Sequence, residues 1–359
     1  MMGVDVNFGP NHYVPVLKIK RGEKGALDDL GAKHPGAFTP LLEVVSRKSD
    51  KTLEQHIDTT FDKLAQSVAR LSPCFLDTRE LAADGEAASR AVFQRAHAEN
   101  ISFVPVVGIT RTVGNTAALQ HRENGVALRI TLKEMEAGGL AHDIQDFLQA
   151  NALNERSVDL IMDMGDVSQM ISAGVSALAD AFLQEVPDHA KWRTFTLSGC
   201  AFPRSMAVVG GKNSHRLWDR SEWVCWKGLY TQRAGLSRLP TFSDCAIQHP
   251  DGVEGFDPIR HQASASARHA TGDHWLLVKG ESTRVKKSSL QFPQIAKSIV
   301  ANKYGNHYKG AGHCTGCKLI SDAANGAPKL GSLEKWRLIG TIHHISTVLK
   351  EDLSALRWP

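Results

Sequence analysis

Hydrophobic residues along this chain occur in short runs that alternate with amphipathic stretches. Phe38–Val45 is one such run, and it has the length and composition of a buried strand. In the stretch that follows, Thr52–Leu71, apolar side chains such as Leu53, Ile57 and Phe61 recur at helical spacing. The same order, an apolar run and then an amphipathic stretch, is repeated along the first 250 residues. This pattern predicts a regular succession of strands and helices.

Eight strands are expected from these runs. They are Tyr13–Ile19, Phe38–Val45, Cys74–Thr78, Ile101–Ile109, Val126–Thr131, Val158–Met164, Arg193–Leu197 and Thr241–Ile247. The helices expected between them are Gly22–Gly31, Thr52–Leu71, Gly85–Ala98, Asn115–Gln120, Leu140–Leu153, Ser168–Val186 and Ser221–Tyr230. A helix between successive strands favours parallel pairing, and about eight such units close a barrel in roughly 250 residues. We therefore predict an α/β fold, a TIM-like (β/α)8 barrel. Arg21–Gly25 lacks the spacing of a dinucleotide-binding loop, which weighs against a Rossmann fold.

The chain beyond Pro250 has a different pattern. The segments expected there are a turn-rich loop at Gly252–Asp257, a strand at Trp275–Lys279, a helix at Phe292–Lys303, a loop at Asn306–Leu330 and an apolar segment at Trp336–Val348. We expect the last of these to pack on the barrel. The sequence thus predicts a barrel over residues 1–250 and a C-terminal elaboration over residues 251–359, packed on the same barrel as a single domain overall.

Charged side chains interrupt the apolar runs near their ends. They are Lys18, Lys20, Glu43, Asp77, Arg79, Arg129, Asp163 and Asp244. Because an unpaired charge costs several kcal/mol to bury, these side chains are expected at a shared polar mouth rather than in the core. In a parallel barrel that mouth is the carboxyl end of the strands, where barrel enzymes have their active sites.

These charges suggest roles in a phosphate-handling site. Lys18, Lys20, Arg79 and Arg129 would bind an anionic group such as phosphate, with Lys279 and His344 as further ligand contacts. The catalytic candidates Glu43, Asp77, Asp163 and Asp244 would bind a divalent metal or move protons, which leaves the cofactor open. This set suits phosphodiester or nucleotide hydrolysis. The alternative is an internal salt-bridge network in which acids and bases neutralise each other within the mouth.

Composition narrows the class of protein. The 359 residues carry 42 Lys and Arg against 38 Asp and Glu, a net charge of +4 that does not by itself indicate nucleic-acid binding. No apolar run approaches the roughly 20 residues of a membrane helix, and the start of the chain has no signal-peptide pattern. Six mostly isolated cysteines do not resemble a secreted disulfide scaffold. We expect a cytoplasmic protein without a membrane partner.

Cysteine and histidine pairs near the end of the chain raise a metal hypothesis. Cys314 and Cys317 have the spacing of a zinc-binding pair, and His313 or His307 would add a third ligand. Because no second cysteine pair follows, we favour two ordinary thiols on a loop and predict no metal ligands. The neighbours His343 and His344 would point to opposite faces on a strand, so that at most one could face a common site.

Four segments resemble the "beta protein" family of tailed phages and bacterial genomes. They are Tyr13–Glu23, Leu239–Pro250, Trp275–Gly280 and Trp336–Ile345. Two positions depart from the family pattern, since Cys245 replaces an aromatic residue and His313–Cys317 replaces a Phe-Ser-Trp-Gly-Asp segment. The resemblance implies a phage-related or phage-defence setting and no particular reaction.

Two functions therefore remain open. The first is an enzyme or enzyme-like barrel acting on a phosphorylated ligand, such as a nucleotide or a nucleic-acid end. The second is a non-catalytic structural or ligand-sensing module with a protein partner in a phage or defence assembly.

Overall fold

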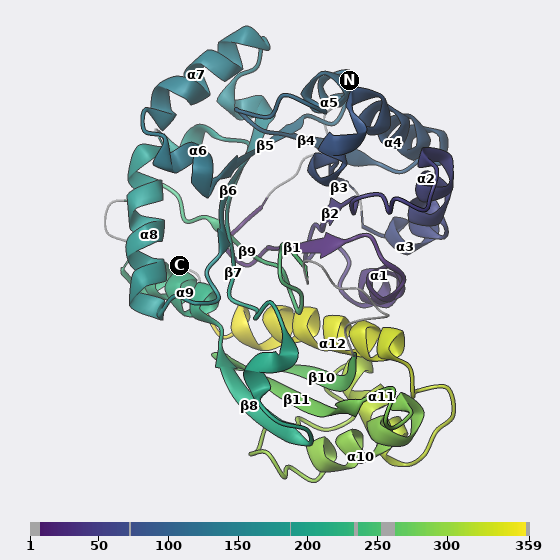
Figure 1. Cartoon of the computed structure of the whole chain (residues 1–359). Coiled ribbons are helices and arrows are strands. Elements are labelled where there is room, and N and C mark those ends of the chain that lie inside the picture. Colours follow the sequence, from purple (N-terminus) through teal and green to yellow (C-terminus); the bar gives the residue numbers. More distant parts are fainter. Residues whose placement is uncertain (1–7, 72, 187, 233–235, 253–262, 357–359) are drawn as a thin grey trace.

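Eight parallel strands form a closed barrel, as the sequence predicts (Figure 1). The computed structural model describes residues 8–71, 73–186, 188–232, 236–252 and 263–356. The barrel strands, in spatial order, are β1 (Tyr13–Lys18), β2 (Leu41–Glu43), β3 (Cys74–Asp77), β4 (Phe103–Val107), β5 (Val126–Thr131), β6 (Val158–Asp166), β7 (Thr194–Cys200) and β9 (Thr241–Asp244). The bounds of β5 are those predicted from the apolar run. Nearly all strand residues are buried, which explains their continuous hydrophobic character.

Helices surround the barrel on its outside (Figure 1). They are α1 (Arg21–Lys33), α2 (Leu53–Phe61), α3 (Leu64–Val68), α4 (Glu86–Ala98), α5 (Asn115–Leu119), α6 (Leu132–Glu136), α7 (Leu140–Ala150), α8 (Ser172–Glu185) and α9 (Ser221–Gln232). The stretch predicted as one helix, Thr52–Leu71, is two. Thr52 begins α2 with a capping box to Gln55, and Lys63 interrupts the stretch with a left-handed φ of 60°. A left-handed residue cannot continue a right-handed helix, so the chain starts again at α3.

A second, three-stranded antiparallel sheet lies beside the barrel (Figure 1). Its order is β10 (Ser264–Thr271), β11 (His274–Ser282) and β8 (Ser214–Asp219), and neither β8 nor β10 was predicted. The helices α10 (Ser288–Val300), α11 (Thr315–Ala324) and α12 (Leu333–Thr347) accompany it. The sheet and these helices share a hydrophobic cluster of their own. Because β8 comes from the barrel half of the sequence and pairs with β11, the two parts of the chain are interleaved.

The loop expected over Asn306–Leu330 is wrong, since α11 occupies its middle. The strand assumed for His343 and His344 is also wrong, because both lie on α12. The predicted loop at Gly252–Asp257 falls outside the described residues, apart from Gly252. No helix in the described part of the chain is long and apolar enough to cross a membrane.

Helix α12 runs beside α1 along the barrel (Figure 1). Gly22 of α1 favours the close approach, since an added Cβ would lie 3.3 Å from the carbonyl oxygen of Glu334 on α12. The other face of α12 contacts β10, and the Cβ of an alanine at Gly340 would lie 3.1 Å from the carbonyl oxygen of Arg268. Helix α12 therefore joins the barrel to the small sheet.

Candidate functional site

The strand-end charges lie at the carboxyl ends of the barrel strands, as the sequence predicts. In the parallel register Lys18 lies opposite Glu43, and Glu43 lies opposite Asp77. Asp163 lies opposite Thr131, the last residue of β5. The side chain of Asp77 also accepts a hydrogen bond from the backbone N–H of Arg79, which makes a tight turn directly after β3. The position of each charge within its strand therefore sets its place in the mouth.

Arg129 is the centre of a buried ion-pair network in this mouth. Its guanidinium lies 2.8 Å from Glu43 Oε1, 3.0 Å from Asp77 Oδ2 and 2.7 Å from Asp163 Oδ2, and its side chain is only 1% exposed. Arg79 adds a contact of 2.6 Å to Glu43 and one of 3.5 Å to Asp163. Three carboxylates that were candidates for a catalytic role are thus paired with arginines.

A third arginine, Arg111, completes the network and was missed by the sequence analysis. Its Nη2 lies 3.0 Å from Asp77 Oδ1. Burial alone would raise the pKa of Asp77, but the charges of Arg111, Arg129 and Arg79 lower it to about 2. Burial is likewise outweighed at Glu43 by Arg79 and Arg129, and at Asp163 by Arg129 and Arg79, so that the pKa of each lies below its usual value. All three carboxylates are therefore ionised at neutral pH and neutralised by three guanidinium groups.

Asp244 belongs to a separate buried chain of hydrogen bonds. It accepts hydrogen bonds from the hydroxyl of Tyr13 and from His344 Nε2, the latter at 2.9 Å. The other ring nitrogen of His344 accepts a hydrogen bond from Trp275 Nε1 at 3.2 Å. An indole N–H only donates, so Nε2 of His344 carries the proton shared with Asp244. These four side chains link β1, β9, β11 and α12, and neither Asp244 nor His344 reaches the pocket described next.

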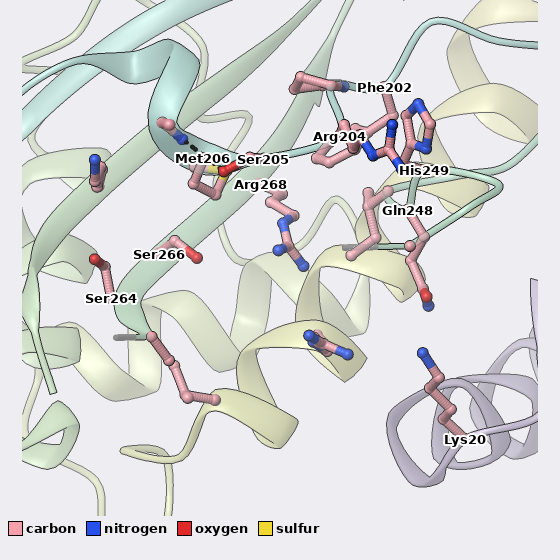
Figure 2. A pocket seen from close by; sticks show the side chains of 18 residues that line it. Lys20, Phe202, Arg204, Ser205, Met206, Gln248, His249, Ser264, Ser266 and Arg268 are labelled. Carbon is pink, nitrogen blue, oxygen red and sulfur yellow. Dashed lines mark hydrogen bonds between the residues drawn. The ribbon is translucent and has the colours of Figure 1, made fainter. Parts of the chain in front are cut away.

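A pocket of about 610 Å³ lies at the same end of the barrel as the strand-end charges. Figure 2 shows the side chains that line it. The pocket is formed by the loops that follow the neighbouring strands β7, β9 and β1, together with β10, β11 and α12. Lys20 enters it from the start of α1 and Arg268 from β10, while Gln248 and His249 enter from the loop after β9 (Figure 2). Its remaining described lining is Phe202, Pro203, Arg204, Ser205, Met206, Ala207, Ile247, Gly252, Ala263, Ser264, Ser266, Lys279, Leu333 and Arg337.

The described lining of the pocket is strongly basic. It contains five side chains of lysine or arginine and none of aspartate or glutamate. Burial lowers the pKa of Arg268 to about 10, aided by the nearby charge of Arg337, and its Nε is buried without a hydrogen-bond partner in the described structure. The pKa of Lys20 is also lowered, first by burial and then by Arg337. The pocket therefore holds cations that repel each other.

Polar neighbours of the pocket are mostly occupied by other protein groups. His249 Nε2 lies 2.9 Å from Asp166 Oδ2, and its Nδ1 accepts a hydrogen bond from the backbone N–H of Asp251. Gln248 donates a hydrogen bond to Glu23, the acid behind Lys20. Burial raises the pKa of Glu23, although the charges of Arg337 and Lys20 oppose this change. Both ring nitrogens of His249 thus lie close to protein groups, although Nε2 makes no well-aligned hydrogen bond.

The predicted site residues therefore separate into three groups. Glu43, Asp77, Asp163, Arg79 and Arg129 form the network, with Lys18 beside it. Asp244 and His344 share the buried chain, and Lys20 and Lys279 line the pocket. The sequence analysis missed Arg268, which lies on the unpredicted strand β10. It also missed Arg337, although Arg337 directly follows Trp336, the start of a segment that resembles the family.

Comparison with known proteins agrees with the resemblance of the four segments. A search of curated proteins finds no match. The family model described as Beta protein matches residues 13–350, which include the whole barrel, the small sheet and α12. The chain belongs to the Beta protein family.

Proposed function

We propose that this protein binds a phosphorylated ligand, such as a nucleotide or a nucleic-acid end, in the basic pocket. The volume of about 610 Å³ lies within the range of small-molecule sites. Ser205, Ser264 and Ser266 in the lining would provide hydroxyl donors around the phosphate. The location beside the carboxyl ends of three barrel strands is also the usual place for a ligand in this architecture.

The observation that carries this proposal is the environment of Arg268. Its guanidinium packs 5.5 Å from the ring of Phe202, and its Nε has no hydrogen-bond partner among the described residues. A buried donor without a partner costs free energy, and so does the repulsion from Arg337 and Lys20. A phosphate group would relieve both costs, since it accepts several charge-assisted hydrogen bonds.

Hydrolysis of the phosphorylated ligand, the second role that the sequence suggests, has less support than binding. A catalytic role for Glu43, Asp77, Asp163 and Asp244 stays a prediction, as does a divalent metal at these carboxylates. Glu43, Asp77 and Asp163 are paired with arginines, and Asp244 accepts hydrogen bonds from Tyr13 and His344. A metal would have to displace these partners before it could bind. The geometry therefore favours binding of the ligand over its hydrolysis.

Calorimetric titration with ATP, pyrophosphate and adenosine tests the proposal. We expect ATP and pyrophosphate to bind and adenosine not to bind. Arg268→Gln and Lys20→Ala should each weaken binding of ATP by at least about tenfold, because charge-assisted contacts to phosphate contribute about 1.5–3 kcal/mol each. Lys20→Ala should leave the melting temperature unchanged or raise it, since it removes a like charge from the cluster.

The matched control is Lys133→Ala, which removes an exposed lysine from α6 on another part of the barrel. It changes the net charge by the same amount and should not alter binding. Equal affinity of the wild-type protein and both pocket variants for ATP would contradict the proposal. Failure of a 5′-phosphorylated oligonucleotide, pyrophosphate and ATP to bind at all would do so as well. Release of phosphate from ATP with Mg²⁺ present, abolished by Glu43→Gln, would restore the catalytic hypothesis.

The closed ion-pair network also favours the second function, a ligand-sensing module. A barrel in which arginines neutralise Glu43, Asp77 and Asp163 has the properties of a stable scaffold that reports the presence of a ligand. In this version a protein partner in a phage or defence assembly would recognise the ligand-bound form, in keeping with the family resemblance. We place the protein in the cytoplasm, where its six free cysteines would stay reduced.

A further inference from the structure

Two cysteines and two histidines come together where α11 begins beside α12, away from the basic pocket. Cys314 is the N-cap residue of α11, and Cys317 lies in its first turn. His343 comes from the middle of α12, and His313 directly precedes Cys314. Cys314, Cys317 and His343 are buried. The absence of a second cysteine pair favours ordinary thiols, but the fold brings His343 of α12 to the two cysteines and to His313.

The distances between the donor atoms fit one tetrahedral ion. His343 Nδ1 lies 3.3 Å from Cys317 Sγ and 3.7 Å from Cys314 Sγ. The ligand atoms of His313, Cys314 and His343 all lie within 4.8 Å of one another, and Cys317 stands outside this group but contacts His343. Sulfur and nitrogen ligands of one tetrahedral zinc lie about 3.5 Å apart, given Zn–S bonds of ~2.3 Å and Zn–N bonds of ~2.0 Å. The observed distances to both sulfurs are close to this value.

The hydrogen bonds of His343 leave the correct nitrogen free for a metal. Its Nε2 lies 2.8 Å from the carbonyl oxygen of Ala270 on β10. A carbonyl oxygen only accepts, so Nε2 carries the proton and Nδ1 presents a lone pair to the two sulfurs. Histidine ligands of metals usually donate their second N–H to a carbonyl or a carboxylate in this way.

His313 lies beside a carboxylate. Its Nδ1 lies 3.4 Å from Glu351 Oε1, and its Nε2 is buried without a hydrogen-bond partner in the described part of the chain. The other candidate from the sequence, His307, is engaged elsewhere, because its Nδ1 lies 3.1 Å from the hydroxyl of Thr271. His313 therefore has a buried nitrogen without a hydrogen-bond partner among the described residues, whereas Nδ1 of His307 contacts Thr271.

The backbone of α11 is also suited to this cluster. The backbone N–H of Cys317 donates a hydrogen bond to Cys314 Sγ at 3.3 Å, a contact that stabilises a thiolate. Gly316 allows α11 to approach α12, since an added Cβ would lie 2.7 Å from the carbonyl oxygen of Ile339 and 3.0 Å from the Cβ of His343. A side chain at this position would push the two thiols away from His343.

We propose that Cys314, Cys317, His343 and His313 bind a zinc ion that ties α11 to α12. Each thiol releases its proton to solvent when its sulfur bonds to the ion, and the two thiolates then balance the charge of Zn²⁺. The ion has four protein ligands and no open position, which makes this a structural site. It is independent of the phosphate-binding pocket.

Elemental analysis of the full chain, purified without chelators, should find about one zinc per molecule. Cobalt(II) added to the metal-free protein should give the absorption bands of a tetrahedral cobalt–thiolate centre. Cys314→Ser with Cys317→Ser, and separately His343→Ala, should weaken zinc binding by at least about tenfold. Cys74→Ser with Cys225→Ser is the matched control, since both are buried thiols outside the cluster, and His307→Ala is the control histidine. All of these controls should retain the zinc.

The cobalt spectrum of the wild-type protein decides the question even if the ligand variants fail to fold. Three results would overturn the proposal. The first is wild-type protein with neither zinc nor the cobalt bands. The second is a disulfide between Cys314 and Cys317 in protein kept under reducing conditions. The third is full retention of zinc by the double cysteine variant.

Discussion

Replacement of Arg129 by methionine should lower the free energy of unfolding by about 3–5 kcal/mol. Methionine keeps much of the length of the side chain and removes its charge. Glu43, Asp77 and Asp163 would then lose the cation that all three contact, while Arg79 and Arg111 could neutralise only part of the remaining charge. Denaturant unfolding of the wild-type and variant proteins at pH 7 measures the difference. Arg95→Met is the control, because Arg95 pairs with Glu99 and Asp58 on the surface, and its loss should hardly move the midpoint.

The same variant should change the response to acid. The pKa values of the network carboxylates are lowered by the arginines, so their contribution to stability is complete above the pKa of the unfolded chain, near pH 4. It is lost as the pH falls toward about 2, the pKa of folded Asp77. Without Arg129 these pKa values rise, and acid unfolding should begin at a higher pH. A variant that matches the wild type in both experiments would show that the network contributes little to the fold.

The barrel could be predicted from sequence because its signals are local. A strand buried on both faces is a continuous apolar run, and the helix after it repeats its apolar residues at another period. Val126–Thr131 shows the run at its clearest. The small sheet lacks this signal. In β10, Ser264–Thr271, the buried positions are filled largely by alanine, whose small side chain gives only a weak hydrophobic pattern. In β8, most side chains are partly or fully exposed.

The candidate sites could likewise be predicted in part from local sequence, while the rest depends on residues that are distant along the chain. That Glu43, Asp77 and Asp163 share one end of the barrel follows from their positions in their own strands. Their partners do not follow from sequence, since Arg129 lies 86 residues from Glu43 along the chain. The cysteine pair illustrates the same limit, because its third ligand, His343, comes from another helix 26 residues beyond Cys317. The helical position of His343 is what directs it to the thiols.

A glutamate outside all of these groups should control the stability at alkaline pH. Glu222 on α9 is buried, and neither of its carboxylate oxygens has a hydrogen-bond partner within the described structure. Burial, together with the charge of Asp244, raises its pKa from 4.5 to about 8, although Arg220 opposes this change. At neutral pH the folded protein therefore holds a proton on Glu222 that the unfolded chain has released.

The sign of the pH dependence follows from this difference in bound protons. Below pH 4.5 Glu222 is protonated in both the folded and the unfolded state and has no effect on stability. Between pH 4.5 and about 8 the unfolded state binds fewer protons than the folded state, so the free energy of unfolding falls as the pH rises. Above about 8 the loss is complete. Glu222→Gln removes the ionisable group, so it should match the wild type near pH 4.5 and be more stable by about 5 kcal/mol at pH 9. Glu54→Gln, at an exposed position of α2, should show no such divergence. Denaturant unfolding of the three proteins at intervals from pH 4.5 to 9 measures the effect. A difference in the free energy of unfolding between Glu222→Gln and the wild type that stays constant over this range would contradict the prediction. It would mean that Glu222 is already ionised in the folded protein, because Arg220 outweighs the effect of burial.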